Sequence, residues 1–262
     1  MSVTTIQQAG RGNALTNALI IARRNLLHIK GSPEQLVDMS IQPLMFLVLF
    51  VYVFGGAIAG SSREYLQFFL PGILVQGTAF TPITTALGLN KDFQQGVIDR
   101  FRSLPIARSA VIGGRIAAEA VRIAWGALIM VGFGVLLGFR FEGGTLGALG
   151  GYLLVVAFGV TMCWPMAFLG VTARSPESVN TWGFMIVLPL TFASSVFVPA
   201  DSLPGWLEAV VRVNPITAIV DATRGLMLGG PVAGPVVRSV IWLIVITVVF
   251  APLAIATYRG RR

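Results

Sequence analysis

The stretch GALGGYLLVVAFGVTMCWPMAFLGVT, residues 147–172, contains no charged side chain and decides the class of fold. It is longer than the roughly 20 apolar residues that a helix needs to cross a bilayer. Five other stretches of similar character occur along the chain. We therefore expect one all-helical membrane domain over residues 1–262, with six transmembrane helices at about 42–59, 65–89, 109–139, 147–172, 179–198 and 236–257.

The composition agrees with a protein that lies in lipid. The 262 residues are 55% hydrophobic and only 11% charged, whereas a soluble domain has about 25% charged residues. The mean hydropathy is +0.80. A net charge of +8 could suggest nucleic acid as a partner, but the basic residues lie at the ends of apolar stretches, as in cytosolic loops. We therefore expect contact with membrane lipid and no binding of nucleic acid.

The distribution of basic residues predicts the orientation of the helices. If the N-terminus is cytosolic, most of the 19 Lys and Arg residues fall on the cytosolic side. The outer side then holds only Arg63, Arg140, Arg212, Arg224 and Arg238. Such a bias, together with an even number of spans, places both termini in the cytosol.

Two segments outside the six spans have helical patterns of their own. Residues 13–30 form a basic amphipathic pattern, which favours a helix lying in the headgroup layer before the first span. In residues 199–235, prolines delimit two short helices, at about Pro204–Val213 and Pro215–Leu228. We interpret this pair as re-entrant half-helices that enter the outer leaflet between spans five and six, where protein covers their ends.

The polar stretch of residues 91–105 is the main cytosolic feature. Apolar residues recur at helical spacing, and charged residues occupy the opposite side, which indicates a short amphipathic helix that ends at Pro105. Phe93 and Phe101 are its aromatic anchors. Such a helix is the kind that binds in a groove of another protein. The spacing alone fits equally well a connector that lies among lipid headgroups and binds no protein.

Motifs for catalysis are missing from the sequence. It contains no phosphate-binding GxxxxGK[ST] loop, no GxSxG elbow and no HExxH helix. With one histidine, His28, and one cysteine, Cys163, we expect no catalytic residues and no metal site. Glu119 is the only acid inside a span, and Arg115 and Arg122 lie on its own helix face. We interpret these three residues as a brace at the cytosolic end of the third span rather than as a proton carrier.

Two sequence segments closely resemble the membrane permeases of type-2 ABC exporters, particularly the daunorubicin/doxorubicin-resistance subfamily. The first is QQGVIDRFRSLPIARSAVIGGRIAAEAVR, residues 94–122, and the second is FVPADSLPGWLEAVVRVNPITAIVDATRGLMLGG, residues 197–230. Length, span count and topology agree as well, so the resemblance covers essentially the whole chain. It implies a multi-pass subunit of the bacterial plasma membrane that is not itself an enzyme.

The resemblance also implies partners and roles for particular residues. It implies two copies of a separate P-loop ATPase, which bind ATP and Mg, and a second permease that is identical or paralogous; this chain itself binds no cofactor. The coupling helix that contacts the ATPase would include or adjoin Phe93, Gly96, Val97, Asp99, Arg100, Phe101, Arg102, Pro105 and Arg108. Candidates for the cargo path, on the second and fifth spans, are Thr78, Thr81, Thr85, Phe184, Phe192 and Phe197.

On this reading the protein exports an amphipathic drug or a lipid-like compound. The same scaffold also suits a polysaccharide or a lipid-linked glycan, which is the first alternative. An ion-coupled secondary carrier and a membrane enzyme are further alternatives from other classes. A carrier would work without an ATPase, and an enzyme would need a site that the sequence does not contain.

Overall fold

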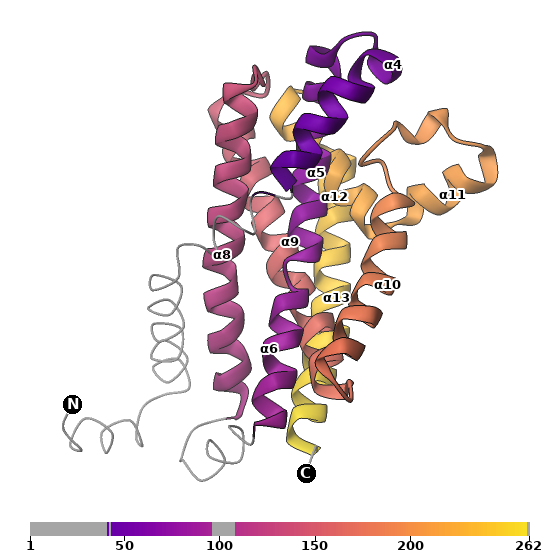
Figure 1. Ribbon diagram of the computed structural model, residues 1–262. Helices are drawn as coiled ribbons and strands as arrows, with labels where there is room; N and C mark the ends of the chain where they lie inside the picture. The colour runs from indigo at the N-terminus through magenta and orange to yellow at the C-terminus, as the bar shows by residue number, and fades with distance from the viewer. Residues whose placement is uncertain (1–40, 42, 96–107, 261–262) are drawn as a thin grey trace, which may run out of the picture.

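The computed structural model describes residues 41, 43–95 and 108–260, and within them the chain is a bundle of helices without strands (Figure 1). The first helix, Pro43–Ala59, includes the π-helical turn η2 (Phe50–Phe54) and α4 (Gly55–Ala59). The others are α5 (Ser62–Phe80), α6 (Ile83–Gln94), α8 (Arg108–Leu136), α9 (Gly144–Thr172), α10 (Pro176–Phe192), η3 (Ala200–Ser202), α11 (Gly205–Val213), α12 (Pro215–Leu228) and α13 (Ala233–Gly260). The expected all-helical fold is confirmed for these residues.

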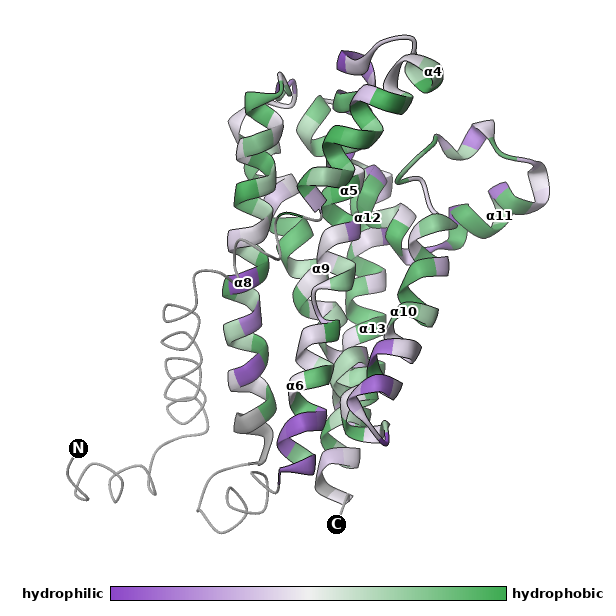
Figure 2. Ribbon diagram, viewed as in Figure 1, coloured by the Kyte–Doolittle hydropathy of each residue, from purple (hydrophilic) through white to green (hydrophobic). Residues whose placement is uncertain are grey.

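Four helical segments are long and apolar enough to cross a membrane. They are Ser62–Gln94, Ile112–Leu136, Gly144–Thr172 and Ala233–Tyr258, and the first helix, Pro43–Ala59, is apolar but shorter. Helix α10 has 17 residues and runs along the same bundle. In Figure 2 hydrophobic residues dominate the middle of the bundle and hydrophilic residues gather toward its ends. The fold is therefore that of a multi-pass membrane protein, and the sixfold span count remains a prediction.

Helices α5 and α6 form one crossing that is interrupted at Thr81 and Pro82. Pro82 has no backbone N–H to donate, so the regular ladder of hydrogen bonds cannot continue through it. The Thr81 hydroxyl donates to the Gly77 carbonyl at 2.9 Å, and the Thr84 hydroxyl donates to the Thr81 carbonyl at 2.8 Å. These hydroxyls thus hydrogen-bond to carbonyl oxygens around the break. At this point the second span, which was predicted to be continuous, divides into two helices.

Helix α9 lies at the centre and packs against α5, α6, α8, α12 and α13. Its glycines let neighbouring helices approach closely, as small residues do in membrane bundles. A Cβ atom at Gly170 would lie 2.7 Å from the Cα of Ala86 in α6, and one at Gly151 would lie 2.8 Å from Cγ of Met227 in α12. The central position of α9 thus depends on glycine residues where it contacts its neighbouring helices.

The two short helices predicted in residues 199–235 are present. Their bounds are Gly205–Val213 for α11 and Pro215–Leu228 for α12. Asn214 joins them: its Nδ2 donates to the carbonyls of Leu190 and Ala193, and its Oδ1 accepts from the Ile216 N–H at 2.8 Å. In Figure 1 α11 projects away from the bundle, whereas α12 packs against α5, α9 and α13. Helix α12 is therefore part of the core, and its position relative to a bilayer stays a prediction.

Candidate functional site

One end of the bundle carries the polar residues that the sequence singled out. Helix α6 ends there, α8 and α10 begin there, and α13 ends there (Figure 1). Lys91, Asp92, Phe93 and Gln94, the start of the expected coupling helix, belong to α6. The ring of Phe93 packs edge-on against Tyr258 of α13, with 5.4 Å between ring centroids. This contact joins the end of α6 to the end of α13.

Most of the residues expected in the coupling helix lie in the segment 96–107, which the structure does not describe. Gly96, Val97, Asp99, Arg100, Phe101, Arg102 and Pro105 lie outside the described residues, as does the expected interfacial helix at 13–30. Arg108 is the first residue of α8. The assignment of these residues to an ATPase contact stays a prediction.

A polar cluster joins α6 to α8; it consists of Thr84, Asp92, Arg115, Glu119 and Arg122, and we call it the α6–α8 cluster. The Arg115 guanidinium contacts the Asp92 carboxylate at 2.6 Å. The Glu119 side chain, only 5% exposed, accepts from the Thr84 hydroxyl at 3.1 Å and lies 3.4 Å from Nη1 of Arg122. In the sequence both arginines flank Glu119, but in the structure Arg115 pairs with Asp92 of α6. The α6–α8 cluster therefore connects two helices, and its role as a brace at the cytosolic end stays a prediction.

The three phenylalanines expected in the cargo path belong to two groups of contacting rings, one formed by η2, the end of α10 and the turn after it, and one formed by α5 and α10. The ring of Phe197 is 5.3 Å from Phe50 and 4.8 Å from Phe192, and Phe184 is 5.5 Å from Phe80. Phe184 and Phe192 are about half exposed, at 48% and 55%. We call Phe50, Phe80, Phe184, Phe192 and Phe197 the aromatic face. It offers flat apolar surface to a neighbouring molecule.

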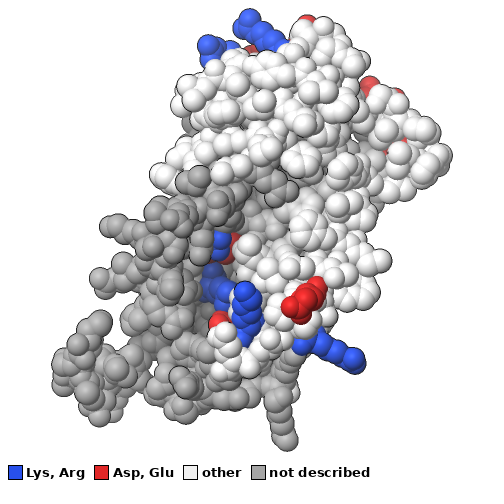
Figure 3. Space-filling view, viewed as in Figure 1, with Lys and Arg blue, Asp and Glu red and all other residues white. Residues whose placement is uncertain are grey.

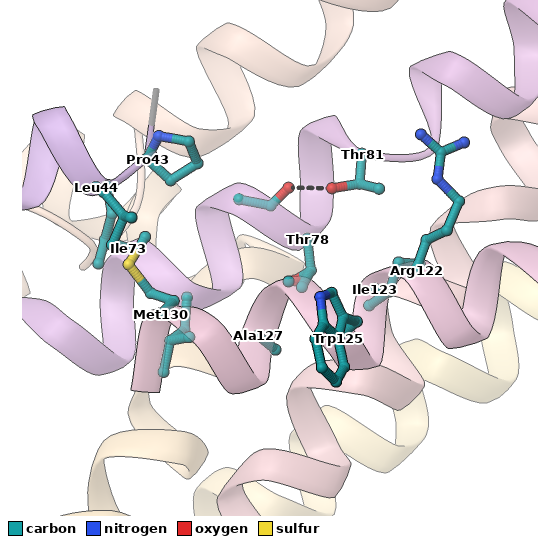
Figure 4. A pocket seen from close by; sticks show the side chains of 13 residues that line it. Pro43, Leu44, Ile73, Thr78, Thr81, Arg122, Ile123, Trp125, Ala127 and Met130 are labelled. Carbon is teal, nitrogen blue, oxygen red and sulfur yellow. Dashed lines mark hydrogen bonds between the residues drawn. The ribbon is translucent and has the colours of Figure 1, made fainter. Parts of the chain in front are cut away.

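The three threonines expected in the path lie elsewhere. Thr78 and Thr81 line a pocket between the first helix, α5 and α8, together with Arg122 and Trp125 (Figure 4). Thr85 is 1% exposed, and its hydroxyl makes no hydrogen bond within the described residues. The six expected path residues therefore divide among the aromatic face, this pocket and the interior.

A second polar cluster, on α12, was missed by the sequence analysis. From the sequence, Arg224 counts only as one of the basic residues on the outer side, yet its side chain is only 17% exposed in the structure. Its guanidinium donates to the carbonyls of Phe68 and Ser195 at 3.2 and 3.0 Å and lies over the Phe68 ring at 3.8 Å. Asp221 lies 3.5 Å from Arg224 and accepts from the Ser195 hydroxyl at 2.7 Å.

This α12 cluster, Ser195, Asp221 and Arg224, fastens α12 to α5 and to the turn after α10. The signal available in the sequence was the spacing of Asp221 and Arg224, three residues apart on one helix. Their depth could not be read from it, because α12 is buried on most of its sides by α5, α9 and α13 and not along a single apolar stripe.

The described residues contain no group of three or more His, Cys, Asp or Glu side chains that could hold a metal ion. In Figure 3 charged side chains lie at the top edge, on the projection at the upper right and in the lower half of the face shown, and the described surface of the bundle between the top edge and the lower half is uncharged. Apolar helices with a charge-free band between polar ends define a multi-pass membrane protein.

The family is shown by sequence comparison. Residues 16–228 match the ABC-2 type transporter family, and the chain belongs to that family. It is 38% identical to the daunorubicin resistance ABC transporter permease protein DrrB1 of Streptomyces coeruleorubidus, over 97% of this chain and 90% of that protein. It is 30% identical to the probable doxorubicin resistance ABC transporter permease protein DrrC of Mycobacterium tuberculosis, over 84% of this chain and 80% of that protein.

A more distant relative is the putative transport permease ycf38 of Cyanophora paradoxa, 28% identical over 79% of this chain and 72% of that protein. The resemblance to drug-resistance permeases in the sequence analysis is thereby confirmed. The chain is a permease-type membrane subunit of an ABC transporter, and such a subunit implies an association with an ATPase and with a second permease.

Proposed function

We propose that this protein is the membrane subunit of an ATP-driven exporter that moves an amphipathic, aromatic drug or a lipid-like compound out of the cell. The observation that carries the proposal is the aromatic face. On it the half-exposed rings of Phe184 and Phe192, both on α10, contact Phe80 of α5 and Phe197, and Phe197 in turn contacts Phe50 of η2. Planar rings stack on such a surface with favourable offset geometry. The names of the permease relatives, which mention daunorubicin and doxorubicin resistance, support a cargo of this chemistry.

The energy would come from a separate P-loop ATPase present in two copies, which binds ATP and Mg. Closure of the ATPase pair would displace the residues after α6. Through Phe93 this displacement would reach α13, and through the Asp92–Arg115 pair it would reach α8. A change that favours one packing of these helices over another shifts the population between inward and outward arrangements.

The topology proposed is six crossings with both termini cytosolic. Pro43–Ala59 and α10 would complete the set with the four longer spans, and α11 and α12 would lie on the outer side. The alternation of direction along the bundle in Figure 1 supports this arrangement. A second permease, identical or paralogous, would face the exposed apolar residues of η2 and α10, so that two aromatic faces enclose the path.

The decisive experiment is transport in inverted membrane vesicles that contain this chain and its ATPase. We expect ATP-dependent accumulation of doxorubicin that is lost with a Walker-A variant of the ATPase. Replacement of Phe192 by Ala should lower this accumulation several-fold, and replacement of the exposed Leu253 on α13 by Ala should not. Doxorubicin accumulation driven by an ion gradient without ATPase would overturn the proposal, and ATP-dependent uptake of labelled glycan with no uptake of doxorubicin would favour the glycan alternative.

Binding of the ATPase is tested separately by pull-down. The variants Phe101→Asp and Arg102→Glu place unfavourable charge in the proposed coupling helix, and each should reduce the recovery of ATPase at least several-fold. Arg212→Glu, on α11 at the opposite end of the bundle, is the control. Equal recovery with all three variants would contradict the assignment of residues 91–105.

A further inference from the structure

A second pocket lies at the end of the bundle opposite the α6–α8 cluster (Figure 1). Its walls come from η2, from the first turns of α5 and from the turn that follows α8. Val51 and Leu66 give it an apolar floor, since they are only 2% and 1% exposed. Arg63 and Arg140 also line it, and both are exposed. The pocket shares no residue with the pocket in Figure 4.

The turn after α8 is built so that Arg140 lies beside α5. Gly138 has a φ of 108°, which glycine adopts easily, and it reverses the chain at the end of α8. Phe139 is fully buried and anchors the turn. With its amide oriented to satisfy both groups, Gln67 of α5 accepts from the Arg140 N–H at 2.9 Å and donates to the Arg140 carbonyl at 3.0 Å. Gln67 lies one helical turn after Arg63, so α5 holds the backbone of one arginine next to the side chain of the other.

The two arginines leave the pocket positively charged. Among the described residues no carboxylate forms an ion pair with Arg63 or Arg140. Nη1 of Arg140 donates to the Phe139 carbonyl at 3.3 Å, a neutral acceptor that does not offset the charge. Glu64 and Glu142 are the acids nearest in the sequence, and neither lines the pocket. The lining therefore has two positive charges and no negative one.

The position of Arg63 has no benefit for its own helix. It is the second residue of α5, and a positive charge in the first turn of a helix is opposed by the helix dipole. An anion at this place would be attracted by the guanidinium and by the N-terminal end of the helix together. The placement of Arg63 thus fits an anionic ligand better than a structural role.

The surroundings of the pocket indicate what kind of anion fits. Tyr52 forms part of its wall and is 60% exposed. Val53 and Leu136, which adjoin lining residues in the chain, are 65% and 83% exposed. Tyrosine is enriched where headgroups meet acyl chains, and large exposed apolar side chains in a membrane protein face lipid tails. A basic pocket at this boundary favours a ligand that has both an anionic group and hydrocarbon chains.

From these observations we infer that the pocket binds an anionic phospholipid, with its phosphate between Arg63 and Arg140 and an acyl chain along Tyr52 and Leu137. Each guanidinium can donate two parallel hydrogen bonds to phosphate oxygens. The phosphate of phosphatidylglycerol has a net negative charge, whereas choline neutralises that of phosphatidylcholine. The site does not depend on the cargo, on the ATPase or on which end of the bundle is outside, so it stands or falls separately from the proposed function.

The test measures which lipid stays with the full-length protein. The protein is reconstituted in nanodiscs with equal amounts of phosphatidylglycerol and phosphatidylcholine of identical chains, extracted in mild detergent, and weighed by native mass spectrometry. We expect phosphatidylglycerol to be retained at least several-fold over phosphatidylcholine. Equal retention of the two lipids would overturn the inference.

Neutral variants show whether the two arginines cause the preference. Arg63→Gln and Arg140→Gln should each reduce it, and the double variant should abolish it. Both side chains are exposed and Gln67 holds Arg140 through the backbone, so we expect unchanged thermal unfolding. Arg212→Gln is the matched control, because this arginine is 60% exposed at the same end of the bundle but does not line the pocket. Undiminished preference in the double variant, or an equal loss in the control, would refute the site.

Two further measurements locate the lipid and separate it from other anions. Photocrosslinking from Tyr52→p-benzoylphenylalanine should give several-fold more adduct with phosphatidylglycerol than with phosphatidylcholine. The same replacement at the exposed Leu253 of α13 should give equal adducts. Equal adducts at position 52 would contradict the inference. Glycerol 3-phosphate has the anionic group without chains and should not displace the lipid; displacement would indicate a site for small anions and would also overturn it.

Discussion

At the scale of single residues, the effect of a polar side chain on stability depends on how deeply it is buried and on which groups it contacts. Arg224 and Arg212 are both basic residues on short helices near the same end of the bundle. Arg224 is 17% exposed and contacts two carbonyls, an aromatic ring and Asp221, whereas Arg212 is 60% exposed and pairs with Glu208 on its own helix. The first fastens helices to one another, and the second is a surface ion pair of small energetic effect.

This contrast predicts different outcomes for the same substitution. Arg224→Lys should destabilise the protein by about 1–3 kcal/mol, because lysine cannot reach two carbonyls and stack on Phe68 at once. Arg212→Lys should change stability by less than about 0.5 kcal/mol. Thermal unfolding in detergent measures both. A similar loss in the two variants would mean that the α12 cluster does not hold α12 in place.

Close packing of helix backbones gives a second prediction at this scale. Gly170→Ala should destabilise by about 1–3 kcal/mol, because a Cβ there would overlap the backbone of Ala86, which cannot rotate away as a side chain can. Gly132→Ala on α8 is the matched control, since a Cβ there meets nothing within 4 Å. Its expected effect is neutral or slightly stabilising, by helix propensity. Chemical denaturation measures the stability of both variants, and equal stability would contradict the prediction.

At the scale of elements, the second crossing consists of two helices that meet at a break. Helix α5 packs on α8, α9 and α12, while α6 packs mainly on α9 and α10 and is tied to α8 by the α6–α8 cluster. Helix α6 therefore belongs to the part of the bundle that leads to residues 96–107. Helix α5 belongs to the part that carries the aromatic face. We therefore expect that one helix can tilt about the break at Thr81 and Pro82 without the other.

The break can be removed by one substitution. Pro82→Ala restores a backbone N–H and should preserve thermal stability or raise it slightly, because Pro82 lies at the start of α6, where proline is tolerated far better than inside a helix. ATP-driven export should nevertheless fall several-fold, with ATPase binding unchanged. Pro165→Ala, within the uninterrupted helix α9, is the comparison. Full export activity in Pro82→Ala would show that the break is not needed for movement.

At the scale of the whole molecule, the bundle has two chemically different ends and two different lateral surfaces. One end carries the α6–α8 cluster, and the other carries α11 and the turns before α5 and α9 (Figure 1). The aromatic face and the pocket in Figure 4 lie on different sides of α5. A molecule bound on the aromatic face would therefore lie apart from that pocket.

The proposed orientation is tested by sided labelling. In a Cys163→Ser background, which removes the single native cysteine, a membrane-impermeant maleimide should label Ser202→Cys from outside intact cells. It should label Glu177→Cys, at the start of α10, only after the membrane is opened. The reverse pattern would invert the topology, and with it the place of residues 91–105.

The sequence alone determined the class of fold, the positions of the long helices and the family. The class of fold and the helix positions follow from long uninterrupted apolar stretches, because in lipid such stretches fold as helices that satisfy their own backbone hydrogen bonds. The family follows from two specific motifs. It also determined the bounds of α11 and α12 closely, because prolines at fixed positions limit where a helix can begin.

Only the tertiary structure decided how polar residues pair and which residues share a surface. Arg115 and Glu119 lie on one helix face, yet Arg115 pairs with Asp92 of α6. Thr78 and Phe192 were both path candidates, yet they lie on different surfaces. In a chain that is apolar on nearly every side, helical periodicity does not show which face meets a neighbour, because lipid and protein interior have similar polarity. The contacts between helices supply that information, and they form only when the bundle assembles.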